Sequence, residues 1–235
     1  MNVFPYCRSV AMKYRHTLTL LGVVLILLGL VERSWFLVLI WLGCNFLILG
    51  WAYSRNYHRI FGKRTDGSLP LWSWLFFFPF LIYTMFIWHL VRLFSREPSQ
   101  STVSEHLVVG RRLLTFEVDG QFDNYIDLTA EFHEPLTIRR SHSYQSFPIL
   151  DGTSPTPKAL RAALAGLRPG RTFIHCAQGH GRTGLFALAV LLSSGKAQNV
   201  EDGLEMLTVV RPGIRLSKDQ HACIYAFARQ IATER

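Results

Sequence analysis

A chain of 235 residues has room for one or two domains. It is 49% hydrophobic and only 17% charged, against about 25% charged residues in a typical soluble domain, which argues against an ordinary soluble globule and against intrinsic disorder. The net charge of +9 is concentrated in residues 1–103, which hold ten Lys and Arg but three Asp and Glu. Because this basic excess lies in the apolar half, we interpret it as charge that flanks a membrane and expect no nucleic-acid partner.

Three apolar stretches without Asp, Glu, Lys or Arg predict a helical membrane domain over residues 1–94. They are residues 17–31, 35–53 and 69–91. At about 1.5 Å of rise per helical residue, the second and third are long enough to cross a hydrocarbon core of about 30 Å, while the first is short. The brief polar turn between the first two predicts a helical hairpin.

The third stretch leaves two interpretations open. Pro79 lies near its middle, and a proline removes a backbone hydrogen bond and kinks a helix. The stretch is therefore either a kinked span or a re-entrant or interfacial element. Tryptophans near its ends favour anchoring at the membrane interface: Trp72, Trp74 and Trp88.

The ten basic residues of this half predict an orientation through the positive-inside tendency. If residues 69–91 do not cross, nine Lys and Arg lie inside and one lies outside; with three full crossings the split is seven to three. The first arrangement agrees better with the tendency. The sequence therefore predicts an integral protein of the cell or inner membrane, with two or three membrane helices, whose polar half faces the cytoplasm.

Residues 95–103 are polar and contain Pro and Ser, which is typical of a linker. Beyond them, short runs rich in β-branched and aromatic residues predict strands at residues 107–109, 125–128, 144–149 and 171–175. Helical patterns fall between and after them, at residues 158–167, 183–194, 200–210 and 217–232. Strands that alternate with helices predict an α/β fold over residues 104–235.

The strand that ends at His175 runs directly into a glycine-containing loop and then an apolar helix. Such a loop points backbone N–H groups inward and forms an anion-binding nest at the positive end of the helix dipole. Cys176 begins the loop and Arg182 closes it, with five residues between them. The same donors favour a thiolate, which is the nucleophilic form of cysteine, and hold phosphoryl oxygens, two of which the arginine fork can bind. Gly179 and Gly181 allow the backbone to curl.

This segment, His-Cys-Ala-Gln-Gly-His-Gly-Arg-Thr-Gly, resembles the signature of the cysteine-dependent protein tyrosine phosphatase superfamily, and most closely that of the small atypical dual-specificity phosphatases. Three further elements of the family have counterparts here. They are an opening strand, a general-acid loop with nearby prolines, and a carboxy-terminal Arg-Pro and Gln pattern, at residues 107–110, 148–157 and 211–220. The resemblance covers about residues 104–235 and says nothing about residues 1–95.

The resemblance implies a dual-specificity-phosphatase-like α/β domain, with a central sheet flanked by helices, and a set of catalytic roles. The implied roles are nucleophile for Cys176, phosphate binding for Arg182, general acid for Asp151, support of the nucleophile for His175 and assistance to thiolate departure for Thr183. The implied substrate-binding residues are those of the loop: Ala177, Gln178, Gly179, His180, Gly181 and Arg182. For His180, an exposed residue and a residue that shapes the charge of the pocket are equally compatible interpretations.

Two other carboxylates, Asp127 and Glu131, are alternative general acids, although Asp127 lies within a predicted strand, which favours a structural role. An inert buried thiol is the alternative for Cys176, and a turn aspartate is the alternative for Asp151. We expect no metal or other cofactor, because the four cysteines are scattered and form no ligand cluster.

The sequence therefore predicts a membrane-anchored phosphatase that hydrolyses phosphate monoesters through a phosphocysteine intermediate. A phosphorylated protein, at tyrosine or serine/threonine, is the expected substrate. A phospholipid or phosphoinositide is the alternative, since the anchor holds the site near lipid; the loop has no Lys and no second Arg, which disfavours polyphosphoinositides. A pseudophosphatase that only binds phosphorylated partners is a third interpretation, which the complete set of catalytic residue types argues against.

Overall fold

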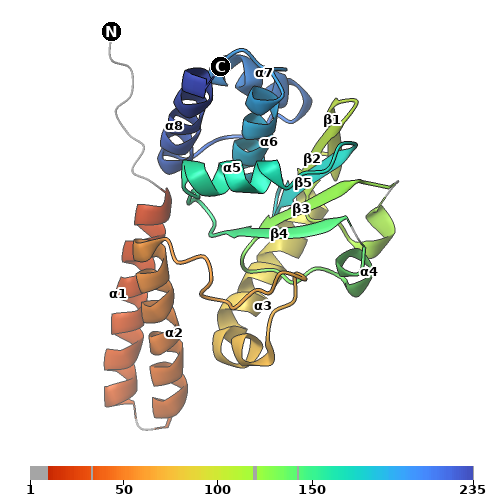
Figure 1. The fold of residues 1–235 in the computed structure, drawn as a ribbon. Coiled ribbons are helices and arrows are strands. Elements are labelled where there is room, and N and C mark those ends of the chain that lie inside the picture. The colour runs from red at the N-terminus through yellow and green to blue at the C-terminus, as the bar shows by residue number, and fades with distance from the viewer. Residues whose placement is uncertain (1–9, 33, 119–120, 142, 235) are drawn as a thin grey trace.

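A long helical hairpin stands beside an α/β domain in the computed structural model, which describes residues 10–32, 34–118, 121–141 and 143–234 (Figure 1). The hairpin consists of α1 (Val10–Val31) and α2 (Phe36–Arg55). The two helices pack so closely that a Cβ atom added at Gly22 would lie 2.8 Å from the carbonyl oxygen of Gly43. Small residues at such a contact are typical of helix pairs in membranes.

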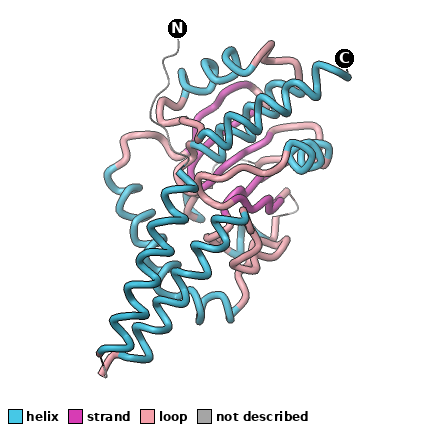
Figure 2. The backbone as a smooth tube through the Cα atoms, turned by 90° about the vertical axis from the view of Figure 1, so that its left-hand side faces the viewer, coloured by secondary structure: helices cyan, strands magenta, loops and turns pink. Residues whose placement is uncertain are grey.

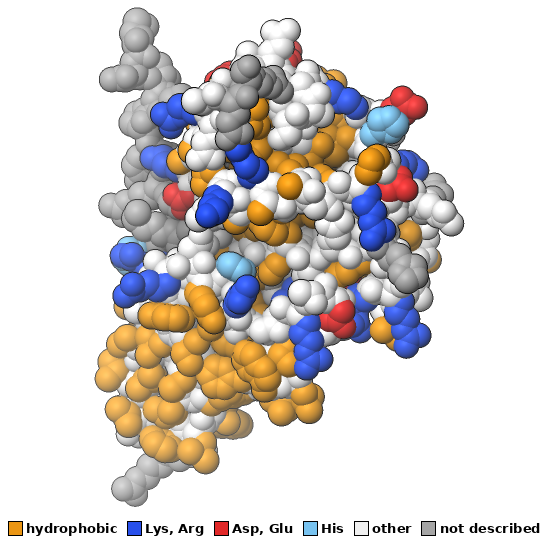
Figure 3. Space-filling view, in the orientation of Figure 1, with side chains coloured by type: hydrophobic (Ala, Val, Ile, Leu, Met, Phe, Trp, Pro, Cys, Tyr) orange, Lys and Arg blue, Asp and Glu red, His pale blue; other side chains and the backbone are white. Residues whose placement is uncertain are grey.

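Both hairpin helices, and a third that follows them, are long and apolar enough to cross a membrane by length and composition. The first helix is longer than the charge-free stretch 17–31 suggested, because it begins before that stretch. With 22 residues, α1 is about 33 Å long. Figure 3 shows orange apolar side chains covering the lower part of this region, with blue Lys and Arg side chains above them at the level of the α/β domain.

The third helix, α3 (Leu71–Phe94), packs against the α/β domain as well as against the hairpin. It is kinked as expected, since Phe77 has non-helical backbone angles (φ −92°, ψ 16°) two residues before Pro79. Phe77 and Leu81 are buried in an apolar cluster that includes Leu150 of the α/β domain.

A mixed sheet of five strands forms the centre of the α/β domain, which confirms the expected fold class. The strands are β1 (Gln100–Ser104), β2 (Leu107–Arg111), β3 (Asn124–Thr129), β4 (Tyr144–Ile149) and β5 (Thr172–Cys176). Their spatial order is β1-β2-β5-β3-β4, and all neighbours are parallel except β1 and β2. The expected linker at residues 95–103 is thus not a plain connector, because its last residues belong to β1.

Alternate residues of the strands point to two different apolar clusters, as expected for a sheet with both faces covered. On one face, Val109, Ile126 and Ile174 pack with α6 (Gly181–Ser193). The other helices on that side are α5 (Pro157–Ala165), α7 (Val200–Val210) and α8 (Lys218–Glu234), seen together in Figures 1 and 2. The opposite face carries a second cluster with Ile138 of α4 (Leu136–Arg139), and a short 3₁₀ helix (Thr115–Glu117) follows β2.

The loop between α2 and α3, residues 56–70, ties the hairpin to the α/β domain by polar contacts along its length. The side-chain amide of Asn56 donates to the carbonyl of Ser154 (2.7 Å). Asp66, near its other end, pairs with Arg139 (3.1 Å). Between them, the ammonium group of Lys63 lies 2.6 Å from a carboxylate oxygen of Asp127 in β3. This loop therefore fixes the α/β domain relative to the helices that precede it.

Candidate active site

The expected anion-binding loop lies between the end of β5 at Cys176 and the start of α6 at Gly181. Gly179 has a φ of +76°, and a Cβ atom there would lie 2.4 Å from the carbonyl group of Gly110 in β2. Only glycine fits this combination of backbone conformation and close approach. The amide N–H of Gly179 donates to the sulfur of Cys176 at 3.3 Å, which stabilises negative charge on that sulfur.

Carbonyl groups of the loop are bound from outside, and this turns the N–H groups inward. Arg211 donates to the carbonyl oxygens of Gln178 and Gly179, each at 2.9 Å. The indole N–H of Trp88, from α3, donates to the carbonyl oxygen of Ala177 (2.9 Å). In a trans peptide the carbonyl and the next N–H point in opposite directions. The N–H groups that follow these carbonyls therefore face the side of the loop where Cys176 lies.

Arg182 is 2% exposed and is held by the carboxylate of Glu131, whose two oxygens accept from the guanidinium at 2.8 and 2.9 Å. Burial alone would lower the pKa of Arg182, but the carboxylates of Glu131 and Asp151 raise it well above its ordinary value. Its Nε atom is buried and has no hydrogen-bond partner among the described residues. An unpaired buried donor costs free energy unless a ligand satisfies it, so this atom is available to a phosphate.

Asp151 follows β4 and projects toward the same loop. One of its carboxylate oxygens lies 3.2 Å from the guanidinium of Arg182, and its side chain is 52% exposed. It is therefore beside the group that would hold a phosphate and still accessible to water. The two alternative acids are less available. Glu131 uses both oxygens on Arg182, and Asp127 is fully buried and paired with Lys63.

His175 lies beneath the nucleophile and is fully buried. Its ring contacts those of Phe173 and Tyr125, with centroid distances of 5.5 and 5.0 Å. Its Nδ1 atom lies 3.4 Å from the carbonyl oxygen of Cys176. Burial lowers the pKa of His175, which favours the neutral ring. This placement supports the backbone at Cys176 and gives the ring no contact with a substrate.

Asp127 and Lys63 form a buried ion pair next to His175. Burial alone would raise the pKa of Asp127, but the Lys63 ammonium, together with His175 and hydrogen bonds, holds it well below its ordinary value. Lys63 also donates to the backbone carbonyl and hydroxyl oxygens of Thr129, at 2.6 and 2.9 Å. A residue that precedes α3 thus reaches the strand adjacent to the nucleophile.

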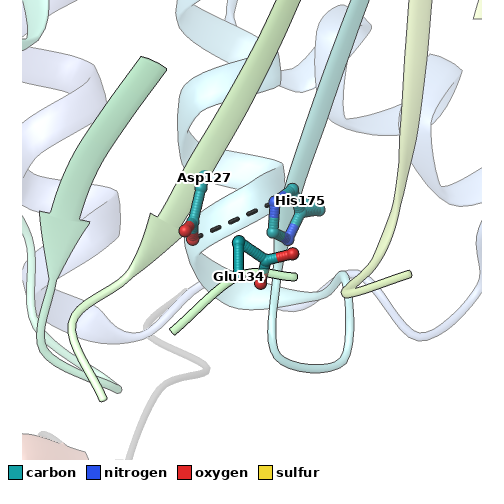
Figure 4. Close-up of side chains that lie close together, drawn as sticks. All are labelled: Asp127, Glu134 and His175. Carbon is teal, nitrogen blue, oxygen red and sulfur yellow. Dashed lines mark ion pairs between the residues drawn. The ribbon is translucent and has the colours of Figure 1, made fainter. Parts of the chain in front are cut away.

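Figure 4 shows Asp127, Glu134 and His175 close together, with one potential metal-ligating atom from each within 4.8 Å of the others. The two carboxylates already have cationic partners, Lys63 for Asp127 (2.6 Å) and Arg112 for Glu134 (2.7 Å). A metal ion would compete with both. We therefore assign this cluster to packing and charge compensation.

His180 at the far end of the loop is tied to the segment after α3. Its Nε2 atom lies 2.7 Å from a carboxylate oxygen of Glu97, and the other oxygen of Glu97 accepts from the backbone N–H of Gly213 (2.8 Å). His180 both lines the cavity above Cys176 and holds this contact. Thr183 lies in the first turn of α6 with its hydroxyl buried and without a partner among the described residues, so the expected bond to the thiolate is not formed in this state.

A cavity of about 670 Å³ lies above Cys176, and its walls come from both halves of the chain. Its polar end contains the loop residues 176–178 and 180–182, together with Glu131 and Asp151. More than half of its lining residues belong to α1, α2 and α3. Of the expected substrate-binding residues, Gly179 alone does not line the cavity.

Three contacts at the site were not predicted from the sequence. Glu131 was considered as an acid and instead holds Arg182. Trp88 was expected to anchor the membrane interface, but it is 1% exposed and bonded to the loop. Lys63 was considered only as one of the ten basic residues counted to predict the membrane orientation. A buried arginine needs a carboxylate partner, and this requirement is the signal by which the pairing of Glu131 with Arg182 could have been found.

No protein-family model matches the chain, and no curated protein matches it. Several solved structures are similar to it. A structure named Tk-PTP in its active form has 23% sequence identity and a TM-score of 0.51, covering 57% of this chain and 98% of its own. The α/β domain, a five-stranded sheet flanked by helices, has a dual-specificity-phosphatase-like fold.

Two further structures of this fold are similar. A mouse putative dual-specificity phosphatase, complexed with zinc tungstate, has 13% identity and a TM-score of 0.50 over 60% of this chain and 93% of its own. PTPMT1 in complex with PI(5)P has 13% identity and a TM-score of 0.49 over 58% and 99%. At these identities the likeness establishes the fold alone, and the chemistry follows from the site.

Proposed function

We propose that the protein is a membrane-anchored phosphatase that hydrolyses phosphate monoesters through a phosphocysteine intermediate. The observation that carries this proposal is the loop from Cys176 to Arg182, in which a sulfur with an N–H donor and a buried guanidinium face one cavity. The phosphatase fold of this half of the chain supports it. The reaction requires one nucleophile, one acid and a cradle for three phosphoryl oxygens.

In the first step, the Cys176 thiolate attacks phosphorus, an S–P bond forms and the ester P–O bond breaks. Asp151 gives its proton to the departing oxygen. In the second step, Asp151 takes a proton from water, the water oxygen attacks phosphorus, and the S–P bond breaks to release inorganic phosphate. The inward N–H groups and Arg182 stabilise the charge of both transition states, and Glu131 keeps the guanidinium in position.

The role of Asp151 can be tested with leaving groups of different acidity. Asp151→Asn removes the proton donor, so we expect the rate to fall by about 10²-fold or more for alkyl phosphates. An aryl phosphate with a very acidic leaving group needs little protonation and should react at nearly the parent rate. The measurement is kcat for a series of esters. Equal losses across the series would contradict the assignment of Asp151 as the acid.

We also propose that α1 and α2 cross the membrane and that the catalytic half faces the cytoplasm. The turn between α1 and α2 lies at the end of the hairpin farthest from the α/β domain (Figures 1 and 2), so the chain returns to the side on which it started. The packing of α3 on the α/β domain supports two crossings over three.

A reporter fused to the carboxyl terminus tests this orientation. A fluorescent protein should fluoresce there, whereas alkaline phosphatase should stay inactive because it requires export. Strong alkaline phosphatase activity would place the catalytic half outside and contradict the proposal.

The chemistry at Cys176 is the same for a phosphoprotein and for a phospholipid. The sequence favoured a phosphoprotein by its resemblance to dual-specificity phosphatases. The substrate class depends on the walls of the cavity above the thiol, and these walls come mostly from the membrane helices.

A further inference from the structure

We propose that the cavity above Cys176 binds a membrane glycerolipid ending in a single phosphate monoester, with the phosphate in the catalytic loop and an acyl chain among α1, α2 and α3. This inference rests on the proposed phosphatase function and names the substrate class for the same site. It is carried by the composition of the cavity walls, their charge and the direction in which the cavity extends.

The cavity walls are single faces of membrane helices. The lining residues of α1 are Tyr14, Thr17, Leu18 and Leu21, which are spaced by three or four residues around one helix face. Those of α3 follow the same spacing and include Phe80, Thr84 and Ile87. α2 contributes Phe46 and Tyr53, two turns apart. Three helices thus present apolar stripes to one space, which is continuous with the loop around Cys176.

The cavity leads from the loop into the apolar part of the hairpin. Tyr14 and Tyr53 contact each other, with ring centroids 5.4 Å apart, and both line the cavity that reaches Arg182. Leu21 lies seven residues beyond Tyr14, about 10 Å farther along α1 toward the hairpin turn. That direction leads to the surface covered by apolar side chains in Figure 3. A chain that extends from a phosphate at the loop therefore enters the region expected to be hydrocarbon.

The charge of the lining residues fits one phosphate. Arg182 is the only Lys or Arg among the lining residues that the structure describes, and Glu131 and Asp151 lie next to it. A headgroup with several phosphates would place its extra charges against these carboxylates, which is unfavourable. The polar end therefore suits a single monoester, as in phosphatidate.

A protein substrate fits these walls poorly. The backbone N–H and C=O groups beside a phosphorylated side chain would lose their water against apolar helix faces without gaining hydrogen bonds, which is unfavourable. An acyl chain has no such groups. A volume of about 670 Å³ also lies within the usual range of small-molecule sites.

The test compares lipid and soluble esters on the full-length protein in mixed micelles of detergent and phosphatidylcholine. The substrates are dioleoyl phosphatidate, glycerol 3-phosphate, a phosphotyrosine peptide and para-nitrophenyl phosphate. We expect kcat/KM for phosphatidate to exceed that for glycerol 3-phosphate by about a hundredfold or more, which burial of a few methylene groups supplies. The phosphopeptide should react no faster than para-nitrophenyl phosphate.

A matched pair of variants on α1 locates the acyl site. Leu21 is 40% exposed and lines the cavity, whereas Leu20 is 67% exposed and does not line it. Leu21→Trp should lower the ratio of phosphatidate to para-nitrophenyl phosphate hydrolysis at least about tenfold, because the larger ring fills the acyl path. Leu20→Trp should leave that ratio unchanged. Thr84→Trp, on the facing α3, should act as Leu21→Trp does and serves if the latter does not fold.

The outcomes separate this inference from the proposed function. If no ester is hydrolysed, the phosphatase function itself is wrong. If para-nitrophenyl phosphate and the phosphopeptide react and phosphatidate does not exceed glycerol 3-phosphate, the lipid assignment alone is overturned. Equal effects of Leu21→Trp and Leu20→Trp on the ratio would also overturn it.

Discussion

Cys176→Ser should reduce phosphate release by at least about a hundredfold, which corresponds to about 3 kcal/mol of lost transition-state stabilisation. A serine hydroxyl keeps its proton at neutral pH. Among the described residues, the hydrogen bond to the Cys176 sulfur comes from the backbone N–H of Gly179, and His175 faces the backbone carbonyl of Cys176 and not its sulfur. The measurement is the release of inorganic phosphate from para-nitrophenyl phosphate by purified protein. Because the substitution changes one atom, the variant should still bind vanadate and melt at the parent temperature.

Cys223→Ser is the matched control. This thiol is buried in the core, its pKa is raised to about 11 mainly by burial, and it contacts the carbonyl oxygen of Pro155. Its substitution should leave the rate within about threefold of the parent, because it lies outside the cavity lining. EDTA should leave the parent rate unchanged, since the proposed steps use a thiolate and a carboxyl group. A Cys176→Ser variant with more than about 1% of parent activity would contradict the assignment of Cys176 as the nucleophile.

The catalytic loop could be predicted from the sequence because its geometry is local. Eight consecutive residues from His175 contain the strand end, the turn glycines and the helix start, and the glycines satisfy a backbone requirement that other residue types do not. Gly179 is the clearest case, since its φ of +76° and its approach to Gly110 both exclude a side chain. The alternation of strands and helices over residues 104–235 was predictable for the same reason, because each element carries its own periodicity.

The contacts that join the two halves could not be predicted in this way. Trp88 is 89 residues from Ala177, whose carbonyl it binds, and Glu97 is 83 residues from His180. Their own segments have the composition of a membrane helix and of a linker, which is what the sequence indicated. Whether these residues meet depends on how α3 packs against the α/β domain. No local sequence pattern indicates contacts between residues so far apart in the chain. Likewise β1 was overlooked because an edge strand of five mostly polar residues has no apolar alternation.

These long-range contacts give the membrane helices a role beyond anchoring. Trp88 of α3 donates a hydrogen bond to the loop. Glu97, after α3, binds His180, and Lys63, before α3, binds Asp127. The expected membrane domain therefore supports the active site through Trp88 and Lys63, and the expected linker does so through Glu97. The helices α1, α2 and α3 also provide more than half of the residues that line the cavity. We infer that the catalytic half depends on the helices for stability as well as for location.

The strongest stability effect is expected from Lys63→Met. In the parent, the buried Lys63 ammonium lies 2.6 Å from Asp127, and both side chains are fully buried. Removal of one partner leaves the other as an uncompensated buried charge, at a cost of about 3–5 kcal/mol. In a protein of this size, that corresponds to a fall in melting temperature of about 10 °C, at about 2–4 °C per kcal/mol. Thermal unfolding in detergent, followed by circular dichroism, measures it.

Asp127 determines how this loss varies with pH. Its pKa in the folded parent is held below the ordinary carboxyl value, so its contribution to stability is present above about pH 3.9 and is lost as the pH falls through the folded pKa. Without Lys63, burial dominates and raises the pKa of Asp127, so the carboxyl group takes up a proton more readily. The difference in melting temperature between parent and variant should therefore be larger at pH 7 than at pH 4.

Two further variants decide whether the ion pair is the cause. Lys63→Met combined with Asp127→Asn leaves no buried charge, so it should recover at least about half of the lost stability. Lys158→Met removes an exposed lysine at the start of α5, and a surface change of this kind should alter stability by about 0.5 kcal/mol or less. If Lys63→Met melts within about 2 °C of the parent at pH 7, the loop between α2 and α3 does not hold the two halves together through this ion pair.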